Sequence, residues 1–281
     1  MRIYISADME GITGLVDADD VQPGGRDYER GRRAMTADVN AAVRGAVRAG
    51  ATEVVVNDAH GPMRNLLSET LEPAVRLIRG KPKTMGMIEG LGPGFAALVC
   101  VGYHARAGAH GVLSHSFMGH EIEDMWLDDR PVGEIGLVHA AAAAMGVRLV
   151  ALTGDDAACA EATAWDPAIA AVPVKYARSR FAADLRPDAE ARAAIEEAVA
   201  GALGPIRAVQ PAEPPGPSTA TAALAVRWQS SVVAETLLGI PGVIQVDSRT
   251  VRAAGPPPEL FRQFGVWMRV ASALTNQPPY C

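Results

Sequence analysis

The sequence predicts an α/β fold, with a largely parallel sheet covered by helices on both faces (three layers, α/β/α) and a smaller C-terminal α/β subdomain. Three observations support this prediction. Over the first 155 residues, short apolar runs alternate with longer helix-type patterns. The runs are apolar throughout, as expected of parallel strands buried on both faces. From about residue 170 the pattern changes, so we expect one unit over residues 1–170 and a smaller one over 171–281.

Within the first unit, strands and helices are expected to alternate. The helix at 28–49 places Met35, Val39 and Val43 on one apolar face, and Gly50 ends it as a C-terminal cap. Residues 125–132 have the pattern of a short hairpin. The other expected elements are strands at 2–7, 53–57, 97–103 and 148–153 and helices at 67–79 and 134–145, with long loops at 11–27 and 104–121.

The second unit is richer in proline. An Ala- and Glu-rich helix is expected near 187–203, and the stretch from Pro205 to Pro217 is interpreted as a connector and not as a recognition motif. Beyond it we expect strands at 221–226 and 242–247 and helices at 230–238 and 258–275.

Composition excludes several classes of protein. The 281 residues carry a net charge of −6, whereas a nucleic-acid partner requires a basic face. No apolar run reaches the roughly 18 residues of a membrane span, and the N-terminus enters a strand directly, unlike a signal peptide. Cys100, Cys159 and Cys281 are too far apart for a cysteine zinc site and odd in number, which indicates a reduced, cytoplasmic protein.

Two carboxylates close the first predicted strand. Asp8 and Glu10 lie one residue apart after the run Ile3 to Ala7, so at strand spacing their side chains share one face. Carboxylates that close repel each other unless a positive charge lies between them. The pair therefore indicates a site for a divalent cation.

Two other strands deliver a histidine at the same edge. His60 follows the run at 53–57, and His104 follows the run at 97–103. Ligands in parallel α/β sheets bind outside the carboxyl ends of the strands, so these side chains are expected to meet Asp8 and Glu10. Glu134, which begins a predicted helix, is the next candidate ligand, although a helix-capping role fits it equally well.

Other polar residues have weaker support. His115, in the loop after His104, is placed to act on a substrate, whereas His110, His120 and His139 are expected to have surface or core roles. The acidic stretch from Glu121 to Asp129 is a source of carboxylates for a substrate amine, but we interpret it as a solvated hairpin. Asp58 either supports a ligand histidine or caps its turn.

Motifs of other enzyme classes are absent from the sequence. His120-Glu121 begins like a zinc-protease helix, but Asp124 stands where the second histidine is required. There is no G-x-S-x-G element, phosphate-binding P-loop or correctly spaced dinucleotide fingerprint.

The segment Ser6-Ala7-Asp8-Met9-Glu10-Gly11 has the form S-x-D-x-E-G, and five further blocks follow it in order. They are Met35 to Ala41, Val56 to Gly61, Gly102 to His104, Ser114 to Ser116 and Gly133 to Gly136. Together these blocks resemble the M55 family of metallopeptidases, the D-aminopeptidases. The resemblance covers residues 1–150, and the C-terminal half fits more loosely.

The resemblance implies a two-zinc aminopeptidase that releases N-terminal D-amino acids from short peptides, with a metal-bound hydroxide as nucleophile. It implies that Asp8 bridges both metals, that Glu10 and His104 complete one site, and that His60 and Glu134 complete the other. It also implies that His115 is the catalytic residue outside the metal shell. Large ring-shaped homo-oligomers, as decamers, are implied as well.

Three carboxylates and two neutral imidazoles suit two divalent cations, and mixed nitrogen and oxygen ligation favours zinc, with Mn²⁺ or Co²⁺ as substitutes in vitro. The stereochemistry is not encoded in any motif, so an L-aminopeptidase and a cell-wall peptide amidase remain open. A two-metal phosphatase is a further alternative, with Arg106 as its one evident phosphate ligand. A non-catalytic metal-binding assembly protein is the alternative outside enzymes.

Overall fold

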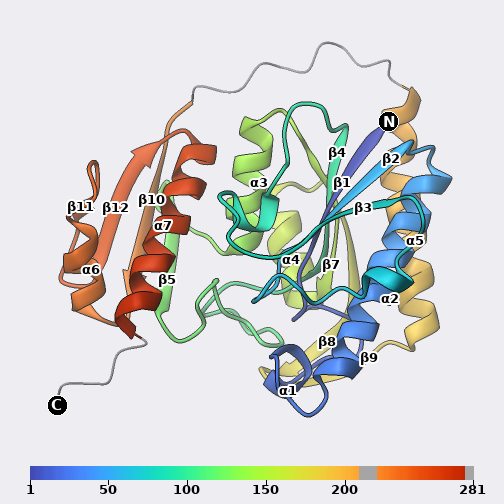
Figure 1. The fold of residues 1–281 in the computed structure, drawn as a ribbon, viewed down its shortest axis with the longest axis horizontal. Helices are drawn as coiled ribbons and strands as arrows, with labels where there is room; N and C mark the ends of the chain where they lie inside the picture. Colours follow the sequence, from blue (N-terminus) through green and yellow to red (C-terminus); the bar gives the residue numbers. More distant parts are fainter. Residues whose placement is uncertain (209–219, 276–281) are drawn as a thin grey trace.

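The larger of two sheets has seven strands in the order β3-β2-β1-β4-β7-β8-β9, and all of them except β9 run parallel (Figure 1). The computed structural model describes residues 1–208 and 220–275. The strands are β1 (Arg2–Ala7), β2 (Glu53–Asp58), β3 (Val75–Ile78), β4 (Ala97–Tyr103), β7 (Leu149–Asp155), β8 (Ala170–Ser179) and β9 (Ala182–Leu185).

Helices cover both faces of this sheet (Figure 1). They are α2 (Tyr28–Arg48) and α5 (Asp188–Ala208) on one face and α3 (Glu134–Ala144) and α4 (Asp156–Trp165) on the other. Alternate residues of β1 serve the two layers, because Ile3 and Ile5 belong to the core beneath α2 while Tyr4 belongs to the opposite core. The expected three-layer α/β arrangement is confirmed.

The smaller sheet is antiparallel, with the strand order β11-β12-β10-β5-β6. Its strands are β5 (Ile122–Leu127), β6 (Arg130–Pro131), β10 (Ala222–Trp228), β11 (Ile244–Gln245) and β12 (Thr250–Gly255). Two helices accompany it, α6 (Ser231–Leu237) and α7 (Pro257–Thr275). Helix α7 also packs against α3, and its Phe264 and Trp267 join the core that extends into the larger sheet.

Most predicted elements are present, but the helix expected at 67–79 is wrong. That segment forms a 3₁₀ turn, Ser68–Thr70, followed by strand β3. Pro73 explains the difference, since proline restricts the residue before it to extended conformations and interrupts a helix. The short helix α1 (Ala18–Val21) lies in the expected loop, and the strand expected at 242–247 is reduced to two residues.

The two sheets do not divide the chain at residues 170 and 171. Strands β8 and β9, which follow residue 169, belong to the larger sheet, and helix α5 packs on that sheet. Strands β5 and β6, which precede residue 170, belong to the smaller sheet. Whether residues 171–281 act as an independent subdomain stays a prediction. The connector expected from Pro205 to Pro217 begins inside α5, which continues to Ala208, and its residues 209–217 lie outside the described residues, as does Cys281. Among the described helices, none is long and apolar enough to cross a membrane.

Candidate metal centre

Asp8, His60 and His104 leave the sheet at the ends of three adjacent strands. In the register of the sheet, Ala7 of β1 lies beside Asp58 of β2 and Val101 of β4. Backbone hydrogen bonds extend this pairing past the strands: Asp8 N donates to Val101 O (2.8 Å), and Ala59 N donates to Ala7 O (2.8 Å). The parallel ladder thus brings the three side chains to one edge.

The two oxygens of Asp8 face two different histidines. Oδ1 lies 3.2 Å from His60 Nδ1, and Oδ2 lies 3.5 Å from His104 Nε2. All three side chains are buried. The predicted convergence of three strand ends is therefore present, with Asp8 at its centre.

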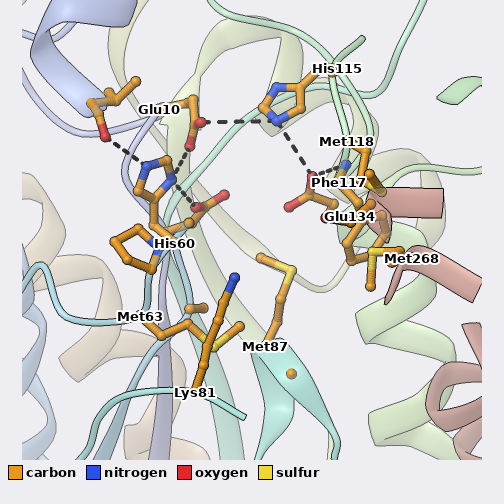
Figure 2. Close-up of a pocket in the computed structure, with 18 of the residues that line it drawn as sticks. Glu10, His60, Met63, Lys81, Met87, His115, Phe117, Met118, Glu134 and Met268 are labelled. Carbon is orange, nitrogen blue, oxygen red and sulfur yellow. Dashed lines mark hydrogen bonds and ion pairs between the residues drawn. The ribbon is translucent and has the colours of Figure 1, made fainter. Parts of the chain in front are cut away.

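Two further carboxylates complete the group. Glu10 Oε2 lies 2.9 Å from His60 Nδ1, and Glu134 Oε1 lies 3.2 Å from His104 Nε2 (Figure 2 shows both acids). Glu134 is the first residue of α3, and its Oε1 also accepts a hydrogen bond from Phe117 N (2.6 Å). We call Asp8, Glu10, His60, His104 and Glu134 the acid–imidazole cluster. Its shortest contacts are between His60 and Glu10 and between His104 and Glu134. The assignment of the five ligands to two metals stays a prediction.

Each cluster histidine is fixed by a backbone carbonyl. His60 Nε2 lies 2.8 Å from Val21 O, and His104 Nδ1 lies 3.0 Å from Ala105 O. Because a carbonyl only accepts, these nitrogens carry the hydrogen, and in the neutral ring the opposite nitrogen presents a lone pair. Those lone pairs, on His60 Nδ1 and His104 Nε2, face the carboxylates.

Imidazole lone pairs that face carboxylate oxygens leave only hydrogen-bond acceptors at this point, and such an arrangement suits a cation. Among the described residues, no Lys or Arg forms an ion pair with Asp8, Glu10 or Glu134. Asp8 Oδ2, Glu10 Oε2 and His104 Nε2 are buried and make no hydrogen bond. Ligand atoms of Asp8, Glu10 and His104 all lie within 4.8 Å of one another. The donor set, carboxylate oxygen with imidazole nitrogen, is one that zinc accepts.

The pKa values show how strongly these charges interact. Burial raises the pKa of Asp8 to about 7, and the charge of Glu10 acts in the same direction. Burial opposes protonation of His60, but the charges and contacts of Glu10 and Asp8 together outweigh it and raise the His60 pKa well above its usual value. His104 behaves likewise beside Glu134. Without a metal the cluster therefore retains protons, which bound cations would replace.

His115 lies beside the cluster and is more exposed than its members. Its ring stacks on His104 with centroids 4.1 Å apart, and its Nε2 lies 4.0 Å from both Glu10 Oε1 and Glu134 Oε1 (Figure 2). Nδ1 lies 2.8 Å from Leu113 O, which fixes the hydrogen there. Burial, and then the charge of His104, lowers the pKa of His115 and favours the neutral ring.

Asp58 caps its turn. Its carboxylate accepts hydrogen bonds from Asn65 N (2.6 Å), Asn65 Nδ2 (2.7 Å) and Leu66 N (2.8 Å) and makes no hydrogen bond to the His60 ring. Asn65 Nδ2 in turn donates to His60 O (2.8 Å), so the network holds the loop that carries His60. Of the two roles considered for Asp58, the structure shows the capping role.

The remaining candidates lie away from the cluster. His110 is exposed, and His139 lies within α3 beside Trp165. Arg106 does not line the cavity at the cluster; its Nη1 donates to Ala107 O (2.9 Å). The acidic stretch at 121–129 does not line the cavity either, and its Glu123 pairs with Arg227 (3.3 Å).

A cavity of about 980 Å³ opens over the cluster. The cluster and His115 lie in one wall. The apolar lining includes Met63, Met87, Phe117, Phe261 and Met268 (Figure 2 shows four of them). Because α7 supplies Phe261 and Met268, this C-terminal helix completes a site that the larger sheet begins.

Sequence reasoning did not identify the lysines. The chain has only three, Lys81, Lys83 and Lys175, among 26 basic residues, and all three lie at the site. Lys175 Nζ donates to the carbonyls of Glu10 (2.6 Å) and Ile12 (2.9 Å), and Lys83 Nζ donates to Asp58 O (2.6 Å). For Lys175 the sequence did hold a signal, since a lysine within the apolar strand pattern of 172–175 is unusual.

A three-layer α/β fold with an acid–imidazole cluster at the carboxyl edge of its sheet defines an α/β metallohydrolase. A model of the peptidase M55 family, described as D-aminopeptidase, matches residues 1–264. The sequence is 41% identical to the D-aminopeptidase of Bacillus subtilis (strain 168) over 215 residues, which are 76% of this chain and 78% of that relative. The chain therefore belongs to the peptidase M55 family and is a hydrolase.

The comparison of structures agrees. The fold is similar to that of the Zn-dependent D-aminopeptidase DppA from Bacillus subtilis, a self-compartmentalizing protease, with a TM-score of 0.90 and 35% sequence identity. The match covers 100% of both chains. It includes α7 and the smaller sheet, so the C-terminal half shares the family's architecture too.

Proposed function

We propose that the protein is a zinc-dependent D-aminopeptidase that releases the N-terminal residue of short peptides. The observation that carries the proposal is the convergence of Asp8, His60 and His104 from three adjacent strands, with buried ligand atoms that lack partners. The names of the similar proteins supply the substrate class and the metal.

Two zinc ions per chain are proposed, with Asp8 between them. Its Oδ1 faces His60 and its Oδ2 faces His104, so one carboxylate reaches both imidazoles. Glu10 and His104 would complete one site, and His60 and Glu134 the other; the ligand atoms of Asp8, Glu10 and His104 lie within 4.8 Å of one another. Zinc bound there would supply Lewis acidity, polarising the scissile carbonyl and lowering the pKa of water from 15.7 to about 7.

His115 is proposed to move the proton. In the neutral ring Nδ1 holds its hydrogen toward Leu113 O, so Nε2 is free to accept a proton from the attacking water and return it to the leaving amine. The ring faces the cavity and is stacked on His104, which holds its orientation.

Assembly is part of the proposal. The similar DppA is a self-compartmentalizing protease, and we propose that this chain also forms a large ring-shaped homo-oligomer, a decamer, with short peptides as its substrates. Short substrates fit the cavity of about 980 Å³, which lies in the upper part of the usual range for ligand sites.

A paired panel of D- and L-aminoacyl peptides, assayed with zinc quantified in the same samples, tests the activity. We expect hydrolysis of the D series, loss of activity with a chelator, and recovery when zinc is restored. Preference for the L series would contradict the stereochemistry, and turnover of p-nitrophenyl phosphate in place of peptides would contradict the reaction class.

Asp8→Ala tests the metal site. Because Asp8 contacts both cluster histidines, its loss should abolish zinc binding and activity together. Glu123→Ala is the control, since this acid does not line the cavity. Zinc content that is unchanged in Asp8→Ala, measured by elemental analysis, would refute the central position of Asp8.

A further inference from the structure

Lys81 extends into the cavity from the wall beside Met63 and Met87, and its ammonium end is directed toward the acid–imidazole cluster (Figure 2). Its side chain is exposed, in contrast to the other two lysines: Lys83 is 9% exposed and Lys175 is fully buried. Of the two lysines that line the cavity, Lys81 and Lys83, Lys81 is therefore the exposed one.

No described residue forms an ion pair or hydrogen bond with the Lys81 ammonium. Burial lowers the pKa of Lys81, and the nearby charge of Arg269 in α7 lowers it further. Arg269 also lines the cavity, and its Nη2 donates to Lys83 O (3.2 Å), which leaves the other donors of the guanidinium open. Two like charges without a carboxylate between them are suited to an anion.

The other lysines at the site already have partners. Lys83 Nζ donates to Asn57 Oδ1 (2.7 Å) and Asp58 O (2.6 Å), and Lys175 donates to three carbonyls of the loop after β1. The ammonium groups of these two are held by the fold, whereas no described residue partners the Lys81 ammonium and Arg269 donates from Nη2 alone, to Lys83 O.

A short peptide has charges at both ends. When its N-terminal residue lies at the acid–imidazole cluster, its C-terminal carboxylate lies elsewhere in the same cavity. Much of the wall there is apolar, and an unpaired carboxylate against it would be costly. Four cationic residues line the cavity, Lys81, Lys83, Arg180 and Arg269. Lys83 donates to Asn57 and Asp58, and the Arg180 guanidinium lies over the Phe181 ring (5.5 Å). Lys81 and Arg269 are therefore the cations best placed to receive the carboxylate.

We infer that Lys81, with Arg269, binds the C-terminal carboxylate of the peptide and so makes the enzyme selective for short peptides with a free C-terminus. This inference rests on the proposed aminopeptidase function. The anion is a carboxylate because the peptide substrate itself supplies one. Lys81 would select substrates and would take no part in bond cleavage.

The test compares peptide acids with peptide amides. For D-alanyl di-, tri- and tetrapeptides of glycine, kcat/KM is measured with a free or an amidated C-terminus. The wild type should favour the acid by about 10- to 100-fold at one of these lengths, as expected for a charge-assisted hydrogen bond. In Lys81→Met this ratio should fall toward one, through loss of activity on the acid and unchanged activity on the amide.

Two matched variants separate binding from structure. Lys81→Arg should retain most of the preference for the acid, because it keeps the charge. Arg262→Met removes an exposed arginine of the same helix as Arg269 that does not line the cavity, and it should leave the ratio unchanged.

A second measurement needs no variant and no turnover. Because Lys81 is the one exposed lysine, acetic anhydride should acetylate it ahead of Lys83 and Lys175, as peptide mapping by mass spectrometry can show. Glycyl-glycine should slow acetylation of Lys81, and glycyl-glycinamide should not.

The outcomes distinguish the two proposals. Equal rates for acid and amide at every length, or an unchanged ratio in Lys81→Met, would overturn the role of Lys81. Absence of hydrolysis in both series would overturn the aminopeptidase function, while selective protection by glycyl-glycine would still support the carboxylate site.

Discussion

At the residue scale, the hydrogen-bond partners of the histidines decide their chemistry. His60 and His104 each give one ring nitrogen to a carbonyl and turn the other toward carboxylates. His115 does the same through Leu113 O, but its free nitrogen also faces the cavity. The roles that we propose for these similar imidazoles, two as metal ligands and one as the residue that acts on the substrate, follow from this difference.

His115→Ala should separate these roles. We expect the variant to bind zinc with the wild-type stoichiometry but to lose about 10²- to 10⁴-fold in kcat, the usual contribution of a general acid–base residue. Elemental analysis and steady-state kinetics on the same preparation measure both quantities. Since the ligand atoms of His104, His115 and Glu134 also lie within 4.8 Å of one another, a loss of metal would make His115 a ligand instead.

The sequence alone was sufficient for the side chains of the cluster but not for their partners. Asp8, His60 and His104 follow apolar runs, so the edge of the sheet on which they meet could be predicted. The groups that orient His60 and Glu134 are backbone atoms of distant segments, Val21 O and Phe117 N, and no residue type marks these atoms. The grouping of ligands around Asp8 likewise depends on distances that only the fold provides.

At the scale of elements, the end of β4 shows how the strand aims His104. Gly102 interrupts the pairing of β4 with β7 and adopts φ of 73°. A Cβ there would lie 2.4 Å from Asp8 O, so only glycine allows β1 and β4 to approach this closely. The cluster thus depends on a backbone contact between its two central strands.

Gly102→Ala should therefore lower the free energy of unfolding by about 4 kcal/mol or more and impair zinc binding. Gly14 is the control, with a similar φ of 81° and nothing within 4 Å of its added Cβ. Gly14→Ala should cost about 1–2 kcal/mol from backbone strain alone. Denaturant unfolding of both variants measures the difference, and equal losses would mean that the close contact with Asp8 is unimportant.

Lys175 of β8 holds the loop that carries Glu10. Its burial lowers its pKa to about 8, whereas an unfolded lysine titrates near 10.4. Between about pH 8 and 10 the unfolded chain therefore binds more protons than the folded one, so the free energy of unfolding rises with pH. Below pH 8 both forms are protonated and this dependence vanishes.

Comparison with Lys175→Met measures that effect. The wild type should gain about 1–2 kcal/mol over the variant between pH 8 and 10, while Lys83, present in both, cancels. Urea unfolding at several pH values provides the measurement. A difference that stays constant across this window would show that Lys175 keeps an ordinary pKa when folded.

Elements with strong periodic patterns were predictable and those set by tertiary packing were not. The long helix α2 and the buried strands β1, β2 and β4 follow from apolar patterns in the sequence. Strands β3 and β9 have four residues each and the shortened β11 has two, too few for a periodic pattern to mark them, and they form because a neighbouring strand offers hydrogen bonds. Strands β5 and β6 join the smaller sheet because β5 pairs with β10, about 100 residues later in the chain, and a local pattern cannot predict such a pairing.

At the scale of the whole molecule, assembly is the largest untested feature. Ile244 and Val246, at the edge strand β11 and just beyond it, are 59% and 57% exposed. Exposed apolar residues on an edge strand are commonly covered by a partner. We predict a particle of about ten chains, each of 29.4 kDa, in sedimentation analysis. A monomer in the active preparation would contradict the ring.

The account as a whole depends on two cations bound between three strand ends and the start of α3. Anomalous diffraction from a crystal of the zinc-loaded protein, recorded on both sides of the zinc absorption edge, tests this most directly. We predict two anomalous peaks per chain, one on each side of the Asp8 carboxylate, with ligand atoms about 2.0–2.2 Å away. Peaks remote from Asp8, or no peak within the acid–imidazole cluster, would contradict the account.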